Sequence, residues 1–164
     1  MNTAVNRKFL SPKILTVAVA LFALLAVQAP AHAGPDGLIT KQSKYSVKVT
    51  LDKLEAVLKK KGITIVTRWS HDAGAKKAGI DLRPTELLIF GNPKLGSHMF
   101  TSKQTSGIDL PMKALAWQDA DGKVWLSYND PAYITKRHGI NDRDKVKAKM
   151  TGALNKLTNV ATGN

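Results

Sequence analysis

Apolar residues recur every three or four positions in two stretches of the chain, the spacing that places them on one face of an α-helix. The first stretch covers residues 51–61, where Thr50 is a suitable N-terminal cap and Gly62 a suitable stop. The second begins at Asn141 and continues toward the C-terminus. Its apolar stripe consists of Val146, Met150, Ala153, Leu157 and Val160. We therefore predict two amphipathic helices that each pack one face against a core.

Strand-like patterns fill most of the chain between these helices and also precede the first one. Alternating, β-branched or continuous apolar runs predict strands over 45–49, 63–69, 86–90, 112–118 and 124–128. The last two flank Asp121-Gly122, a strong hairpin signal. Short helices are predicted over 71–79, within 94–106 and over 131–138. The order β-α-β-β-β-β-α indicates an α+β fold, with a mostly antiparallel sheet and helices packed on one face.

The first 33 residues have the three parts of a cleavable signal peptide. A basic segment without acidic residues precedes an apolar run over 14–27, and the small-x-small motif Ala31-His32-Ala33 follows. A retained membrane anchor is the alternative, but the run is shorter than the roughly 20 apolar residues that a spanning helix needs. We expect cleavage after Ala33, a periplasmic or secreted location, and no transmembrane segment in the mature chain. The mature chain should contain a mobile lead-in over 34–44 and one α+β domain over 45–161.

The chain is strongly basic, with a formal net charge of +13. Loss of Arg7, Lys8 and Lys13 with the signal peptide would lower this charge to +10. Basic surfaces attract polyanions, yet an exported protein is not expected to meet nucleic acid, so we predict no nucleic-acid partner. The charge could serve solubility or contact with an anionic envelope surface. The chain has no Cys, which excludes disulfides and thiolate chemistry, and it lacks the common nucleotide-binding and hydrolase motifs.

Polar residues that could form a ligand site gather at the ends of the predicted strands: His71, Arg83, Glu86 and Asn92. A charged residue that enters a covered strand needs a partner, so Arg83 and Glu86 could form an ion pair that fixes the loop. They could instead orient an anionic ligand, or His71 and Glu86 could act as acid–base groups of an enzyme. Asn92 could contact the ligand or only stabilise a Gly-Asn-Pro turn. We favour ligand binding without catalysis.

Other candidate residues have simpler structural interpretations. His98, Met99 and Met112 could bind a soft metal such as copper, but both methionines also suit a packed core, so we expect no metal or cofactor. Trp117 and Trp125, on the two arms of the hairpin, could form a cross-strand pair or mark a ligand or subunit contact.

Two further polar residues have structural interpretations. His138 precedes a glycine that should stop a helix, where an imidazolium suits the helix dipole. Asp109 precedes Leu110-Pro111 and suits a turn. Neither residue is therefore predicted to belong to the ligand site.

Three segments of the chain resemble the bacterial domain-of-unknown-function 302 family. They are RPTELLIFGNP (83–93), DLPMKALAWQD (109–119) and YNDPAYITKRHGI (128–140), and the similarity extends over 47–157. The resemblance implies a TATA-binding-protein-like fold of order β-α-β(4)-α and a homodimer, but it supplies no activity and no catalytic residue. We therefore expect an exported homodimer that binds a small ligand or serves in envelope stress.

Overall fold

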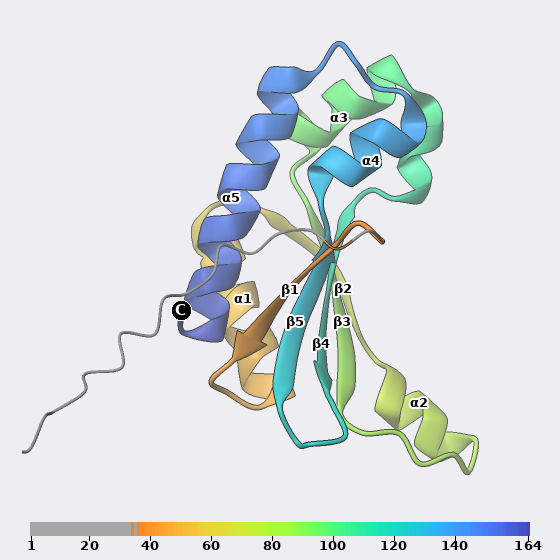
Figure 1. Ribbon diagram of the computed structural model, residues 1–164, viewed down its shortest axis with the longest axis vertical. Coiled ribbons are helices and arrows are strands. Elements are labelled where there is room, and N and C mark those ends of the chain that lie inside the picture. The colour runs from red at the N-terminus through yellow and green to blue at the C-terminus, as the bar shows by residue number, and fades with distance from the viewer. Residues whose placement is uncertain (1–33, 35) are drawn as a thin grey trace, which may run out of the picture.

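One antiparallel sheet of five strands, in the order β1-β5-β4-β3-β2, organises the molecule (Figure 1). A computed structural model describes residue 34 and residues 36–164, and the predicted signal peptide lies outside the described residues. The strands are β1 (Leu38–Ser43), β2 (Thr64–Ser70), β3 (Thr85–Gly91), β4 (Met112–Gln118) and β5 (Val124–Asn129). The helices are α1 (Val47–Lys60), α2 (His71–Lys77), α3 (Pro93–Ser102), α4 (Pro131–His138) and α5 (Asp144–Thr162), with a 3₁₀ helix η1 (Gln104–Ile108). The predicted α+β class is confirmed.

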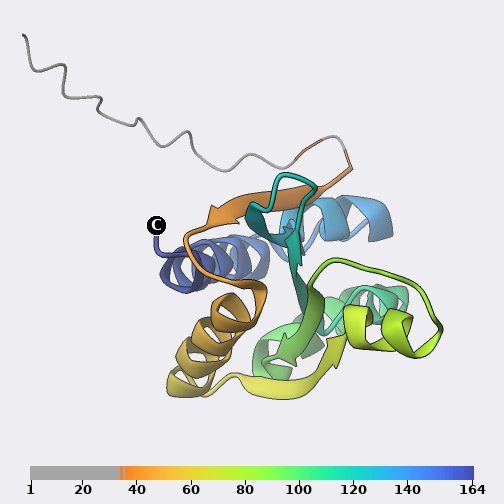
Figure 2. The ribbon, with the colours of Figure 1, turned by 90° about the horizontal axis from the view of Figure 1, so that it is seen from below.

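Helices α1 and α5 lie side by side on one face of the sheet, whereas α3, η1 and α4 gather beyond one end of it and α2 projects from the other end (Figures 1 and 2). The core forms between the sheet and the two covering helices. Leu51, Leu54 and Leu58 of α1 are fully buried, as are Leu88 of β3 and Leu126 of β5. Full burial of one such leucine contributes roughly 1.5–3 kcal/mol, so this layer is a major source of stability.

The prediction is wrong at the start of the domain. Residues 38–43, which the sequence pattern places in a mobile lead-in, form the edge strand β1 and pair with β5. No strand forms over 45–49. Helix α1 begins at Val47 instead, because the Ser46 hydroxyl accepts a hydrogen bond from the Val49 N–H at 3.3 Å and caps the helix. Thr50, the expected cap, is buried within α1. The domain therefore begins with β1 rather than at residue 45.

The remaining elements follow the sequence signals closely. Asp130 caps α4 through its carboxylate, which accepts from the Ala132 N–H at 2.9 Å, and Gly139 ends the helix with φ +63°. The Asp-Gly turn joins β4 to β5 with Gly122 at φ +79°. The start of α5 is Asp144 rather than the predicted Asn141. Caps and turns thus locate most of the element boundaries.

The sheet face opposite α1 and α5 has no covering helix in the described residues (Figure 2), and apolar and polar side chains alternate with one another across it. Strand register places Trp69, Leu87 and Leu115 in one row across it. Trp117 and Trp125 are register partners in the next row, and their rings stack with centroids 6.3 Å apart and planes at 27°. The predicted cross-strand tryptophan pair is therefore present, on the face without covering helices.

Candidate functional site

The structure separates the predicted site residues instead of joining them into one cluster. Arg83 and Glu86 lie at one end of β3, whereas Asn92 follows the other end of this strand, about 20 Å away at the usual rise per residue. His71 is the first residue of α2. The four side chains therefore cannot surround one small ligand.

Arg83 and Glu86 do not form the ion pair that was one of the alternatives, because each side chain has a different partner. Glu86 accepts hydrogen bonds from Arg68 of β2 at 2.6 and 2.7 Å, whereas the Arg83 Nε donates to the Gln118 carbonyl at 3.0 Å. Arg68 also contacts Asp52 of α1 at 2.6 Å. Hydrogen bonds from Lys48 and Arg68 lower the pKa of the Asp52 carboxyl. This network joins β2, β3 and α1, and Glu86 has a structural partner that the sequence did not identify.

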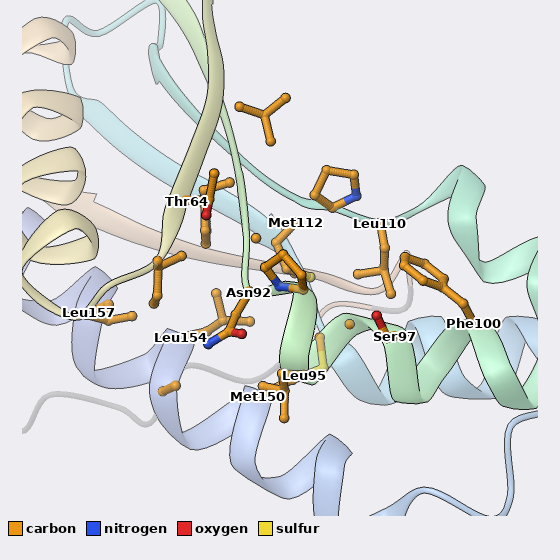
Figure 3. Close-up of a pocket in the computed structure, with 18 residues that line it drawn as sticks. Thr64, Asn92, Leu95, Ser97, Phe100, Leu110, Met112, Met150, Leu154 and Leu157 are labelled. Carbon is orange, nitrogen blue, oxygen red and sulfur yellow. The ribbon is translucent and has the colours of Figure 1, made fainter.

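An apolar cavity of about 290 Å³ lies where α3 and α5 meet the adjoining ends of the strands (Figure 3). Its walls are formed mainly by apolar side chains that come from the strand ends, α3, the segment after η1, and α5: Ile63, Val66, Phe90, Leu95, Phe100, Leu110, Met112, Met150, Leu154 and Leu157. The polar side chains on its wall are Thr64, Asn92 and Ser97. Asn92 is thus the one member of the predicted site that reaches this cavity.

The turn that follows β3 builds one wall of the cavity. Asn92 caps α3, because its side-chain oxygen accepts from the Lys94 N–H at 3.0 Å and Pro93 occupies the first helical position. Gly91 lies close to Pro111, and a Cβ at this glycine would come within 3.0 Å of the Pro111 Cβ. The Gly-Asn-Pro sequence therefore has the turn role that its composition suggests, and it also brings α3 over the strand ends.

The candidate metal ligands divide between the core and the surface. Met99 and Met112 belong to the core, with 1% and 6% of their surfaces exposed, whereas His98 is exposed on α3. Within residue 34 and residues 36–164, there is no group of three or more His, Cys, Asp or Glu side chains that could hold a metal ion. In the same residues, no helix is long and apolar enough to cross a membrane.

The apolar residues of the cavity were missed by sequence reasoning. Leu95, Phe100 and Leu154 have the same helical spacing as ordinary core residues. Periodicity identifies which face of a helix is buried, but it does not show where two buried faces leave space between them. The Gly-Asn-Pro turn is the local signal that points to this place.

These features define a small α+β domain with an apolar cavity at one end of its sheet. The chain belongs to the family described as domain of unknown function DUF302, whose model matches residues 39–157. The matched region begins within β1, and the resemblance predicted from the sequence is confirmed. The crystal structure of an uncharacterized conserved DUF302 protein from Bacillus stearothermophilus superposes with a TM-score of 0.69, and it covers 76% of this chain and 98% of that chain at 18% identity. This similarity shows the fold.

Curated relatives of the chain carry the name fluoride-specific ion channel. The fluoride-specific ion channel FluC 1 of Brucella suis biovar 1 (strain 1330) is 48% identical over 118 residues, which are 71% of this chain and 46% of the relative. FluC 2 of Brucella melitensis biotype 1 is also 48% identical over 118 residues, 44% of its length. The chain therefore spans less than half the length of these relatives.

Proposed function

We propose that this domain binds a small apolar ligand in the cavity between α3 and α5. The observation that carries the proposal is the cavity itself, with a volume of about 290 Å³ and a wall made mostly of apolar side chains. Ligand sites are usually concave, apolar and close to 300 Å³ or larger, with a few polar groups that orient the ligand. A strongly polar ligand would lose its hydration here without gaining enough partners, which favours an apolar one.

The polar groups on the wall refine the ligand's chemistry. The oxygen of the Asn92 amide already accepts from Lys94, so its NH₂ group is the one that can donate to a ligand. Ser97 and Thr64 add hydroxyls to the same cavity. A molecule with an alkyl or aryl body and one hydrogen-bond acceptor, such as a medium-chain carboxylic acid, suits this set. The basic charge of the chain favours an anionic acceptor.

Two glycines provide a matched test of the cavity. Gly96 lies on α3 in the cavity wall, and a Cβ built there would be 3.9 Å from the Phe100 ring, whereas Gly152 on α5 faces open space. Both are helical, so Gly→Leu should increase helix propensity at each. We expect Gly96→Leu to weaken binding of a fluorescent fatty acid at least about tenfold, a loss of about 1.4 kcal/mol, and Gly152→Leu to leave it unchanged. Equal binding by both variants, or no binding by the wild type, would contradict the proposal.

We also propose that the protein is exported and acts as a homodimer, in which the two copies contact each other through the uncovered sheet face. The signal-like sequence of residues 1–33 supports export. The apolar side chains on this face, among them Trp69 with 59% of its surface exposed, support association. The role in envelope stress stays a prediction.

A second candidate function is fluoride handling. It is favoured by the 48% identity to a segment of proteins named as fluoride-specific channels. If the candidate is correct, deletion of the gene from its own host should lower the fluoride concentration that the cells tolerate, with no effect of matched chloride. Reintroduction of the gene should restore tolerance. Unchanged growth of the deletion strain in fluoride would contradict this candidate.

A further inference from the structure

A hydroxyl, an imidazole and a carboxylate form a continuous hydrogen-bonded chain between η1 and α4. The Thr105 Oγ1 lies 3.2 Å from the His138 Nδ1, and the His138 Nε2 lies 2.7 Å from the Asp109 Oδ2. Arg137 contacts the other carboxylate oxygen of Asp109 at 3.1 Å. None of these residues lines the apolar cavity, so this chain of groups, which we name the Thr105 relay, is a separate feature of the molecule.

The Asp109 carboxylate determines which nitrogen of the His138 imidazole carries the hydrogen. An ionised Asp109 can only accept hydrogen bonds, so the Nε2 of a neutral His138 must carry the hydrogen that joins them. The Nδ1 atom is then an acceptor, and the group that faces it is the Thr105 hydroxyl. The hydroxyl therefore donates to a nitrogen that can remove its proton. This is the relation between nucleophile, base and orienting carboxylate that activates a hydroxyl in acyl-transfer enzymes.

The exposure of the three side chains also suits such chemistry. The side chains of His138 and Asp109 are 8% and 9% exposed, whereas Thr105 is exposed on η1. A shielded base and carboxylate keep their geometry, while an exposed hydroxyl can reach a substrate. Local structure holds the imidazole and the carboxylate in place, because His138 is the last residue of α4 and Asp109 directly follows η1.

We propose that Thr105 is a nucleophile that cleaves small carboxylic esters or thioesters. The Thr105 Oγ1 forms a bond to the acyl carbon, His138 takes the hydroxyl proton, and the same proton passes to the departing alcohol or thiol as its bond to the acyl carbon breaks. Water then attacks the acyl-threonine ester, with His138 again as the base, and releases the carboxylic acid and the free hydroxyl. Asp109 is a positioning residue that holds the imidazole.

Two exposed threonines allow a controlled test. Thr105→Ala should lower hydrolysis of p-nitrophenyl acetate at least about 100-fold, the usual contribution of base-assisted attack. Thr101→Ala on α3, where the side chain donates only to the His98 carbonyl, should leave the rate unchanged. Thr105→Ser should retain activity because it keeps the hydroxyl. A fluorophosphonate probe should label Thr105 in the wild type, and mass spectrometry should find the adduct on that residue.

The positioning role has its own readout. Asp109→Asn should lower kcat at an unchanged KM. The amide NH₂ can donate to the Nε2 atom of His138, which leaves the hydrogen on Nδ1, so that this atom cannot accept the Thr105 proton. Because this pair is buried, the variant could lose its fold, in which case the Thr105→Ala result still decides the proposal. No hydrolysis by the wild type, equal rates in wild type and Thr105→Ala, or fluorophosphonate labelling elsewhere would overturn it. Fatty-acid binding in the cavity would be unaffected by such a result.

Discussion

At the scale of single residues, the most unusual environment belongs to Lys41 of β1. This residue is 7% exposed, and four neutral acceptors on α5 share the three hydrogens of its ammonium: the Asn155 carbonyl at 3.0 Å, the Asn155 amide oxygen at 2.7 Å, the Thr158 hydroxyl at 2.8 Å and the Asn159 amide oxygen at 2.5 Å. No carboxylate is among these partners. Burial therefore lowers the pKa of Lys41 to about 8.

The lowered pKa gives a testable pH dependence. Between about pH 8 and the ordinary lysine value of 10.5, the unfolded chain binds a proton at Lys41 that the folded chain has released. Stability rises with pH wherever the unfolded state binds more protons. The unfolding free energy of the wild type, relative to Lys41→Met, should therefore increase by about 2 kcal/mol from pH 7.5 to 9.5. Tyr128, whose pKa is raised by burial, is present in both proteins, so its contribution cancels.

Urea unfolding at the two pH values measures this difference. A difference between the two proteins that stays flat, or that falls with pH, would contradict the assignment. Lys41→Met keeps an unbranched side chain of similar length, so it removes the ammonium with little change in packing.

At the scale of elements, the same residues explain why β1 escaped prediction. Its buried positions are Ile39, Lys41 and Ser43, so two of the three inward side chains are polar. Alternation of hydrophobicity therefore fails in a strand that is half buried. The hydrogen-bond partners of these two polar side chains lie on other elements. Ser43 forms a hydrogen bond with Thr50 of α1, and Lys41 donates hydrogen bonds to α5. A sequence pattern contains no sign of the partners of Lys41, which lie more than a hundred residues away along the chain.

The elements that were predicted have local determinants. Strands β2 to β5 have apolar or β-branched runs, and α4 has its cap, its proline and its glycine within ten residues. The turn role of Asn92 was predicted because that turn is local, whereas the Thr105 relay was not predicted, because Asp109 and His138 are 29 residues apart. The sequence pattern places Asp109 in a turn and His138 at the end of a helix. Neither local role predicts that the two side chains are in contact. Long-range polar contacts are thus what the sequence could not supply.

At the scale of the whole molecule, charge and apolar surface are distributed unequally. The full chain has a net charge of +13, which signal-peptide cleavage would lower to +10. On the uncovered sheet face, Lys113 is the one charged residue among the outward-facing positions of the described strands. Two like-charged copies repel each other least where charged residues are few, and they gain most where apolar surface is removed from water. This argues for a second copy as the occupant of the face.

A charge placed on the apolar part of that face should prevent association. Trp69 and Ile80 are similarly exposed, at 59% and 62%, but only Trp69 lies on the sheet. We expect the wild type and Ile80→Lys to sediment as dimers in analytical ultracentrifugation, and Trp69→Lys to sediment as a folded monomer. Each Trp69→Lys dimer would have to bury two unpaired ammonium groups, which costs more than the apolar contact returns. A monomeric wild type at high micromolar concentration, or a dimeric Trp69→Lys, would show that this face does not join two copies.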